Sequence, residues 1–351
     1  MSDKSDKEVV EFFLKYLRML RGYKNMNIFK IIMIFCLLLI PLPFIDNYTV
    51  AKEMINKMVN TPLACEKPGW FPSGFGLKDH HVFQHGGYYY IVSIYLPGEK
   101  QFAYARSLDL CTWEDLGPIL TASSSDGWES LAKWAPFVLE ENGVYYMYYT
   151  GVTESYTQSI MVATSSNPAD PNSWTQRGMI FQPNHDNMIW QAGRWADCRD
   201  PTVVKIDNVY YMLYTGLDET GGIVGVATAL SPLGPWIDWG AITPPVMNSM
   251  LESPTLVQYG HFYYLFYNNT AAKGERYRYG PAPTGPWSIE YPLTPGWAHE
   301  VWQDSMGEWR TSYLTNYTIS ISKLSWDELL FPPQPYIGYQ RFHVFSPLII
   351  R

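Results

Sequence analysis

The feature that most constrains the fold of this 351-residue chain is a sequence motif that occurs five times. Each copy has an apolar strand start, a turn that carries Gly or Asn, and a burst of aromatic residues, headed in four copies by a Tyr pair. The copies start 45 to 65 residues apart, which suits four short antiparallel strands better than a helical repeat. The sequence therefore predicts an all-β, five-bladed β-propeller, with blades starting at Asp79, Ala135, Asp200, Ser253 and Ala298.

The repeats also end alike, with an apolar strand, a turn rich in Ser, Pro and Gly, and a Trp at position 113, 174, 236 or 287. Such turns separate short strands and leave no room for long helices. Because propeller blades are arranged radially, their first strands surround a central channel. We therefore expect the residues at the strand starts to converge on one funnel, and the regular Tyr pairs to be packing residues.

The N-terminal part of the chain has a different pattern. Apolar residues run from Ile31 to Ile45, interrupted only by Pro41 and Pro43, and basic residues precede them. This predicts a cytoplasmic segment (1–27), a signal peptide or transmembrane anchor (28–45) and a linker (46–69), before the propeller (70–326) and a tail that packs on it (327–351). Whether the protein is anchored in the membrane or secreted stays open, but both readings place the propeller outside the cytoplasm.

Net charge and the number and spacing of cysteines bear on which partners, disulfides and metal sites the protein can have. A net charge of −8 argues against nucleic acid as a partner. Cys36 lies in the apolar run, so that a disulfide is expected from the remaining three cysteines, with Cys65 and Cys111 as the candidate pair and Cys198 left over. The Cys and His spacing matches no zinc site, and no metal ligands are predicted.

Carboxylates occur at the strand starts of only some blades. Asp79 and Asp200 begin their copies, and Glu252 lies one position before the start of its copy. A buried, unpaired carboxylate is costly, so three of them in front of apolar strands need a reason. Glycoside cleavage supplies one, because it needs a carboxylic acid to protonate the leaving oxygen and a carboxylate to activate water or attack the anomeric carbon. A third carboxylate can hold the substrate and raise the pKa of the acid.

With these motifs the chain resembles the five-bladed propellers of glycoside hydrolase family 43 and the related families 32, 68 and 117. The resemblance covers about residues 70 to 326 and rests on Trp134-Ala-Pro, Arg199-Asp-Pro-Thr, Glu252-Ser-Pro-Thr and the Ser-Pro-x-Gly-Pro-Trp turn. It implies that Asp79 is the general base, Asp200 the residue that tunes the acid, and Glu252 the general acid. Glu300, at the start of the fifth blade, is a rival for the acid or a sugar ligand.

The resemblance also bears on mechanism. Families 32 and 68 retain anomeric configuration with an Asp nucleophile in an Asn-Asp-Pro setting, whereas this chain reads Leu77-Lys78-Asp79 followed by His80. Inverting hydrolysis is therefore favoured. No cofactor is expected to be required, although the resemblance leaves room for a single structural calcium or sodium ion on the propeller axis.

Further residues near the strand starts are candidate sugar ligands. Aromatic rings can stack on sugar faces, Arg199 can orient a carboxylate, and the imidazoles and remaining acids can hydrogen-bond to hydroxyls. Long loops at 155–158 and 183–194 slightly favour a pocket, and with it exo action. The predicted substrate-binding residues are Trp134, Trp195, Asp197, Arg199, His80, His299 and Glu300, with Trp297 also facing the funnel.

We therefore expect a glycosidase that hydrolyses O-glycosyl bonds of a poly- or oligosaccharide, with an arabinose- or xylose-type glycan implied by the resemblance. The alternatives are a retaining fructan-type hydrolase or transferase, a propeller that binds glycan without cleaving it, and an envelope interaction protein. An interaction protein should show an exposed apolar patch and no convergence of acids in the funnel.

Overall fold

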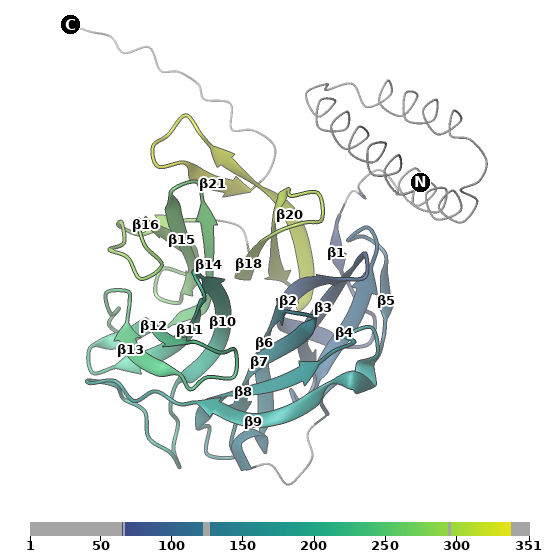
Figure 1. Cartoon of the computed structure of the whole chain (residues 1–351), viewed down its shortest axis with the longest axis horizontal. Coiled ribbons are helices and arrows are strands. Elements are labelled where there is room, and N and C mark those ends of the chain that lie inside the picture. The colour runs from purple at the N-terminus through teal and green to yellow at the C-terminus, as the bar shows by residue number, and fades with distance from the viewer. Residues whose placement is uncertain (1–64, 66, 122–126, 294–295, 338–351) are drawn as a thin grey trace, which may run out of the picture. The chain divides into compact units, whose positions relative to one another are not determined.

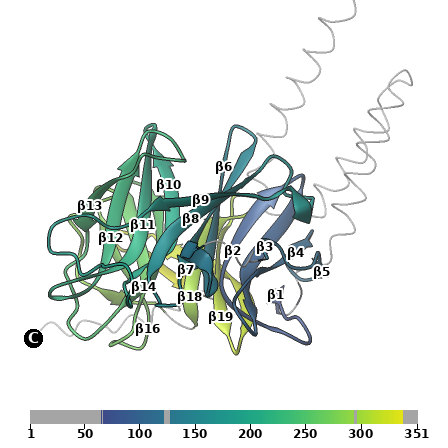
Figure 2. The same ribbon diagram turned by 90° about the horizontal axis from the view of Figure 1, so that it is seen from below.

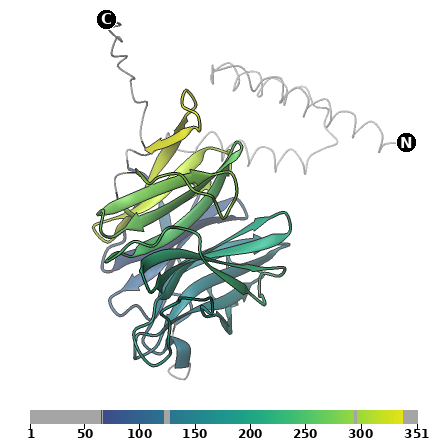
Figure 3. The same cartoon turned by 90° about the vertical axis from the view of Figure 1, so that its left-hand side faces the viewer.

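In the computed structural model the protein forms five antiparallel sheets arranged around one axis (Figure 1). The structure describes residues 65, 67–121, 127–293 and 296–337. Figure 1 shows the first strand of each sheet, β2, β6, β10, β14 and β18, nearest the centre. Figure 2 shows the sheet of β10 to β13 and the sheet of β2 to β5 on opposite sides, and Figure 3 shows the yellow fifth sheet beside the green fourth. The predicted all-β, five-bladed propeller is confirmed.

Each of the first four blades is a meander of four strands in sequence order. Blade 1 contains β2 (Gly76–His85), β3 (Tyr88–Leu96), β4 (Phe102–Ser107) and β5 (Trp113–Asp115); blade 2 contains β6 (Ala132–Glu141), β7 (Val144–Val152), β8 (Gln158–Ser165) and β9 (Thr175–Phe181). Blade 3 contains β10 (Cys198–Ile206), β11 (Val209–Asp218), β12 (Gly221–Ala229) and β13 (Ile237–Ala241); blade 4 contains β14 (Leu251–Tyr259), β15 (Phe262–Asn269), β16 (Gly274–Gly280) and β17 (Tyr291–Pro292). Two short 3-10 helices, η1 (Gly127–Glu129) and η2 (Pro171–Ser173), lie in connections.

Blade 5 combines both ends of the described chain. It contains β18 (Trp297–Gln303), β19 (Trp309–Thr315) and β20 (Thr318–Asp327), and β20 pairs with β1 (Gly69–Trp70) and with β21 (Gln334–Ile337). The propeller therefore extends past the predicted boundary at residue 326, because β21 is a strand of this blade. A disulfide joins Cys65, just before β1, to Cys111 in blade 1. This pairing agrees with the candidate pair named from the sequence.

Five apolar clusters fill the spaces between neighbouring blades. The cluster between blades 1 and 2 includes Tyr90 and Met161, and the one between blades 5 and 1 includes Trp70 and Ile321. The other three join blades 2 and 3, blades 3 and 4, and blades 4 and 5. Members of the Tyr pairs are buried here, among them Tyr145 and Tyr210, which confirms their packing role.

A β-bulge interrupts the pairing of every first strand with the second strand of its blade. A bulge sets two residues of one strand opposite one residue of the other and re-aims their side chains. Two consecutive residues of each blade, at the bulge or directly before it, lie around the axis. The first ring of five contains Lys78, Trp134, Arg199, Glu252 and Trp297, and the second contains Asp79, Ala135, Asp200, Ser253 and Ala298.

The predicted segments 1–27 and 28–45 and most of the linker 46–69 lie outside the described residues, as does the tail beyond residue 337. Within the part of the chain that the structure describes, no helix has the length and apolar character needed to cross a membrane.

Candidate active site

Residues of both rings line a cavity of about 620 Å³, which we call the cleft. This volume lies in the usual range for small-molecule sites, roughly 300 to 1,000 Å³. All five residues of the first ring line the cleft, together with Asp79, Asp200 and Ser253 from the second. The three predicted catalytic carboxylates therefore come from three different blades and line the same cleft.

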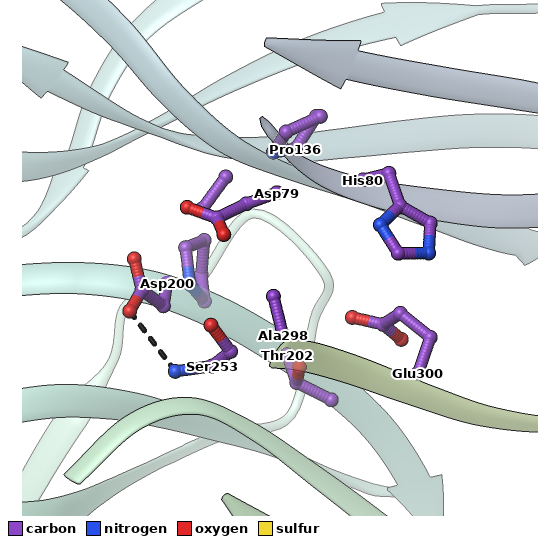
Figure 4. Close-up of a pocket in the computed structure, with 10 residues that line it drawn as sticks. Asp79, His80, Pro136, Asp200, Thr202, Ser253, Ala298 and Glu300 are labelled. Atoms are coloured by element: carbon purple, nitrogen blue, oxygen red, sulfur yellow. Dashed lines mark hydrogen bonds between the residues drawn. The ribbon is translucent and has the colours of Figure 1, made fainter. Parts of the chain in front are cut away.

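Asp79 and Asp200 lie in the throat of the cleft, and Figure 4 shows their carboxylates near each other. Burial, helped by the charges of Asp200 and Glu252, raises the pKa of Asp79 to about 8. Burial also raises the pKa of Asp200 to about 6, although Arg199 acts against this. These carboxyls therefore hold protons at a pH where exposed carboxylates have none.

The backbone holds Asp200 firmly in place. Its φ of 56° lies in the left-handed region, which Asp tolerates better than most residues. One carboxylate oxygen accepts hydrogen bonds from the Ser253 amide at 3.0 Å and from the Thr215 hydroxyl at 3.1 Å. Asp200 is thus fixed to blade 4 at the residue next to Glu252.

Arg199 is the cationic centre of the cleft. Its guanidinium donates to Glu252 at 2.7 Å, pairs with Asp197, and lies 3.8 Å from Asp200. The Glu252 side chain keeps 24% exposure, whereas the Arg199 side chain keeps 10%. Arg199 therefore links the predicted acid to the residue predicted to tune it.

A second polar network supports the opposite wall. Glu99, in the turn after β3, accepts from Lys78 Nζ and from the Trp134 indole, each at 2.5 Å. Lys78 favours the ionised form of its neighbour Asp79 and so opposes the increase in its pKa. Sequence reasoning did not identify Lys78 or Glu99; the signal for Lys78 was its position in the same ring as Glu252.

The structure places the other predicted ligands at two levels. Trp134, Trp195, Trp297 and Arg199 line the cleft, and Asp197 contacts Trp195 and Arg199 just behind it. Below the acids, His80 bonds to Ser312, and His299 bonds to Thr311. His80 and His299 are buried and absent from the cleft wall, so that their contact with sugar stays a prediction.

Glu300, the rival acid, also lies below the cleft. It bonds to His81 at 3.3 Å, and burial raises its pKa. Figure 4 shows Glu300 on the His80 side of the view, away from Asp79 and Asp200. Glu300 lines a small cavity of about 10 Å³ that Asp79 and Asp200 also line, with room for about one water molecule.

This small cavity is where an axial metal ion would be sought. Among the described residues, no group of three or more His, Cys, Asp or Glu side chains could hold a metal ion. Calcium takes about six to eight oxygen ligands. The side chains around the axis therefore do not fit an ion held mainly by protein, and we derive no chemical step through one.

Fold and site together define a class: a five-bladed β-propeller whose axial cleft gathers acidic residues from several blades. Residues 74–195 match the sequence model of the family described as glycosyl hydrolases family 43, which confirms the resemblance to this family. The match includes Asp79 and Trp134, while Asp200 and Glu252 lie beyond it.

Individual proteins show the same likeness. The chain is 28% identical over 169 residues to the probable arabinan endo-1,5-α-L-arabinosidase C of Aspergillus flavus, which covers 46% of this chain and 50% of that protein. The chain spans about half the length of the curated relatives it matches. A thermostable family-43 glycoside hydrolase superposes with a TM-score of 0.61 at 18% identity, over 76% of this chain and 94% of that one. Fructan 1-exohydrolase IIa from Cichorium intybus gives 0.64 at 14% identity, over 78% and 60%. At 18% and 14% identity, these two superpositions show that the fold is shared.

Proposed function

We propose that this protein is a glycosidase that hydrolyses O-glycosyl bonds in an arabinose-type glycan. The observation that carries the proposal is the convergence of Asp79, Asp200 and Glu252 from three blades on one cleft, with Arg199 bound to Glu252. The family 43 match and the arabinan-cleaving relatives support the substrate class.

In the proposed reaction Glu252 donates a proton to the leaving glycosidic oxygen as the bond to the anomeric carbon breaks. Asp79 takes a proton from a water molecule, whose oxygen forms the new bond to that carbon from the opposite face, so that configuration inverts. The products are a sugar hemiacetal and an alcohol. Asp200 holds the substrate and tunes Glu252, and Arg199, which pairs with Asp197, orients Glu252 through the hydrogen bond that it donates to it.

The acid role is tested with aryl arabinofuranosides whose leaving groups differ in acidity. Glu252→Gln should lower kcat/KM about a hundredfold or more for a poor leaving group, and much less for dinitrophenolate, which needs no proton. Glu300→Gln is the matched control. If Glu300→Gln shows this dependence on leaving group and Glu252→Gln does not, the acid has been assigned wrongly.

The base role has its own test. Because Asp79 must be ionised to accept a proton and its pKa is about 8, the pH profile of kcat/KM should have one limb with a midpoint near pH 8. Azide should restore turnover to Asp79→Gly and give a glycosyl azide of inverted configuration. Glycan binding without turnover by the parent protein would instead establish a non-catalytic, glycan-binding propeller.

We also propose that the propeller functions outside the cytoplasm, either anchored by the apolar segment 28–45 or secreted. The Cys65–Cys111 disulfide supports this location, since such bonds persist mainly in oxidising compartments. An axial calcium or sodium ion stays a proposal with no part in the reaction. Membrane fractionation of the full chain, with and without residues 1–45, tests the anchor.

A further inference from the structure

Two tyrosines at the mouth of the cleft have a backbone conformation that tyrosine rarely adopts. The turns between the second and third strands of the blades open on the cleft side, and four of them contain a non-glycine residue with positive φ. That residue is Glu99 in blade 1, Lys273 in blade 4 and Tyr156 in blade 2, whereas blade 5 has two, Asn316 at 51° and Tyr317. Both tyrosines have a φ of 60°.

This conformation is sterically costly for a bulky side chain, and Gly or Asn would adopt it more easily. Burial does not compensate the cost, because Tyr156 is 43% exposed and Tyr317 is 63% exposed. Residues kept in such conformations cluster at ligand sites, so that the observed outlier is a reason to look for a ligand.

Tyr156 is one ring of a stacked aromatic pair. Its ring stacks on the ring of Trp195, with centroids 5.2 Å apart and planes inclined by 20°. Trp195 lines the cleft and donates from its indole to Asp197, which pairs with Arg199. This Tyr156–Trp195 plate therefore lies at the junction of blades 2 and 3 and is connected by two contacts to the guanidinium that holds Glu252.

Tyr317 lines the cleft from blade 5. Its carbonyl accepts from the Leu77 amide at 2.8 Å, which fixes the turn beside Lys78 and Asp79. In a ring of five blades, blade 5 is opposite the junction of blades 2 and 3, since two blades separate them in either direction. The plate and Tyr317 thus lie on opposite sides of the three carboxylates.

We infer that the Tyr156–Trp195 plate and Tyr317 are two sugar-stacking positions on either side of the cleavage point, so that the cleft binds the interior of a polysaccharide chain and cleaves it in endo fashion. Aromatic faces suit the apolar faces of sugar rings. The inference rests on the proposed function and replaces the exo action that loop length favoured in the sequence. The loops at 155–158 and 183–194 carry or adjoin the plate itself.

The test uses linear arabinan and arabino-oligosaccharides of two to six sugars. The parent protein should release oligosaccharides of intermediate length early in the digestion of arabinan. Tyr156→Ala and Tyr317→Ala should each lower kcat/KM for the hexasaccharide about tenfold, mainly through KM, and lower it less for the disaccharide. Trp239→Ala is the matched control, because Trp239 is a 64% exposed aromatic on β13 that does not line the cleft.

A variant that removes the backbone strain at position 317 distinguishes an effect on sugar binding from an effect on folding. Tyr317→Asn should raise thermal stability while it weakens binding of the hexasaccharide to the inactive Glu252→Gln protein, measured by titration calorimetry. If Tyr317 were only structural, Tyr317→Asn would leave hexasaccharide binding unchanged.

The outcomes distinguish this inference from the proposed function. Release of monosaccharide alone from arabinan, or Tyr variants that match the parent on the hexasaccharide, would overturn the endo inference while hydrolysis stands. If no arabinose, xylose or fructose oligosaccharide is cleaved, the proposed function fails. In that case binding that Tyr317→Ala weakens still supports the two positions, and no binding at all overturns both.

Discussion

Replacing Asp79 by Asn should make the folded protein more stable, although it removes the proposed base. The carboxyl of Asp79 has a pKa of about 8 in the folded protein, against an ordinary value of 3.8. Between these values the folded state keeps the proton while the unfolded state loses it. The free energy of unfolding of the parent therefore decreases as pH rises from about 4 to 8. Asn carries no charge in either state and is free of this penalty.

The pKa difference sets the size of the effect. At about 1.36 kcal/mol per pH unit it corresponds to an upper bound of roughly 5 to 6 kcal/mol at pH 8. Water in the cleft solvates part of the carboxylate, so that we expect a gain of about 2 to 4 kcal/mol. Little of that gain should be present at pH 4.

Urea unfolding at pH 4, 6 and 8 measures this gain for Asp79→Asn. Asp186→Asn is the control, because Asp186 is an exposed acid in the loop before β10. A stabilisation by Asp79→Asn that is the same at all three pH values, or that is absent at pH 8, would refute the claim that burial and neighbouring charges raise the pKa of Asp79.

Three further predictions concern groups outside the cleft. Lys133→Met should lower the free energy of unfolding by about 3 to 5 kcal/mol in urea unfolding, because it leaves the fully buried Glu129 without its cation. The double variant Lys133→Met/Glu129→Leu should recover part of this loss. Reduction of Cys65–Cys111, separated by 46 residues, should cost about 4 kcal/mol in the same assay. Burial raises the pKa of Glu275 well above its ordinary value, so that Glu275→Gln should stabilise the protein increasingly as pH rises from 5 to 8; equal stability of parent and variant at pH 8 would contradict this.

The repeat was enough to predict the blades and the convergence of acids, because each blade must bring its first strand to the axis. When the five repeats of the sequence are aligned, Glu252 falls one position before Asp79 and Asp200. The structure explains the offset, since two consecutive residues of every first strand, at the bulge or directly before it, line the axial cavities. A bulge depends on pairing with the next strand, which is a tertiary property that the local pattern does not reveal.

The same geometry explains the histidines. His80 directly follows the bulge of β2 and His299 lies within the bulge of β18, and both side chains bond to residues of blade 5 rather than entering the cleft. Tyr317 was missed because it lies in a short turn, whose residues reach the cleft only once the ring is closed. An Asn before an aromatic residue in a two-residue turn was the available signal, since Asn favours left-handed turn positions.

The pairing of β1 with β20 also determines when the ring of blades can close. β1 is synthesised before blade 1 and β20 after blade 4, and the Cys65–Cys111 disulfide fixes the residue before β1 to blade 1. A growing chain that has passed Glu252 already contains the three acids, yet it has no blade 5 to complete the ring. The cleft, and with it the proposed activity, is therefore expected to be complete only once blade 5 has emerged and paired with β1.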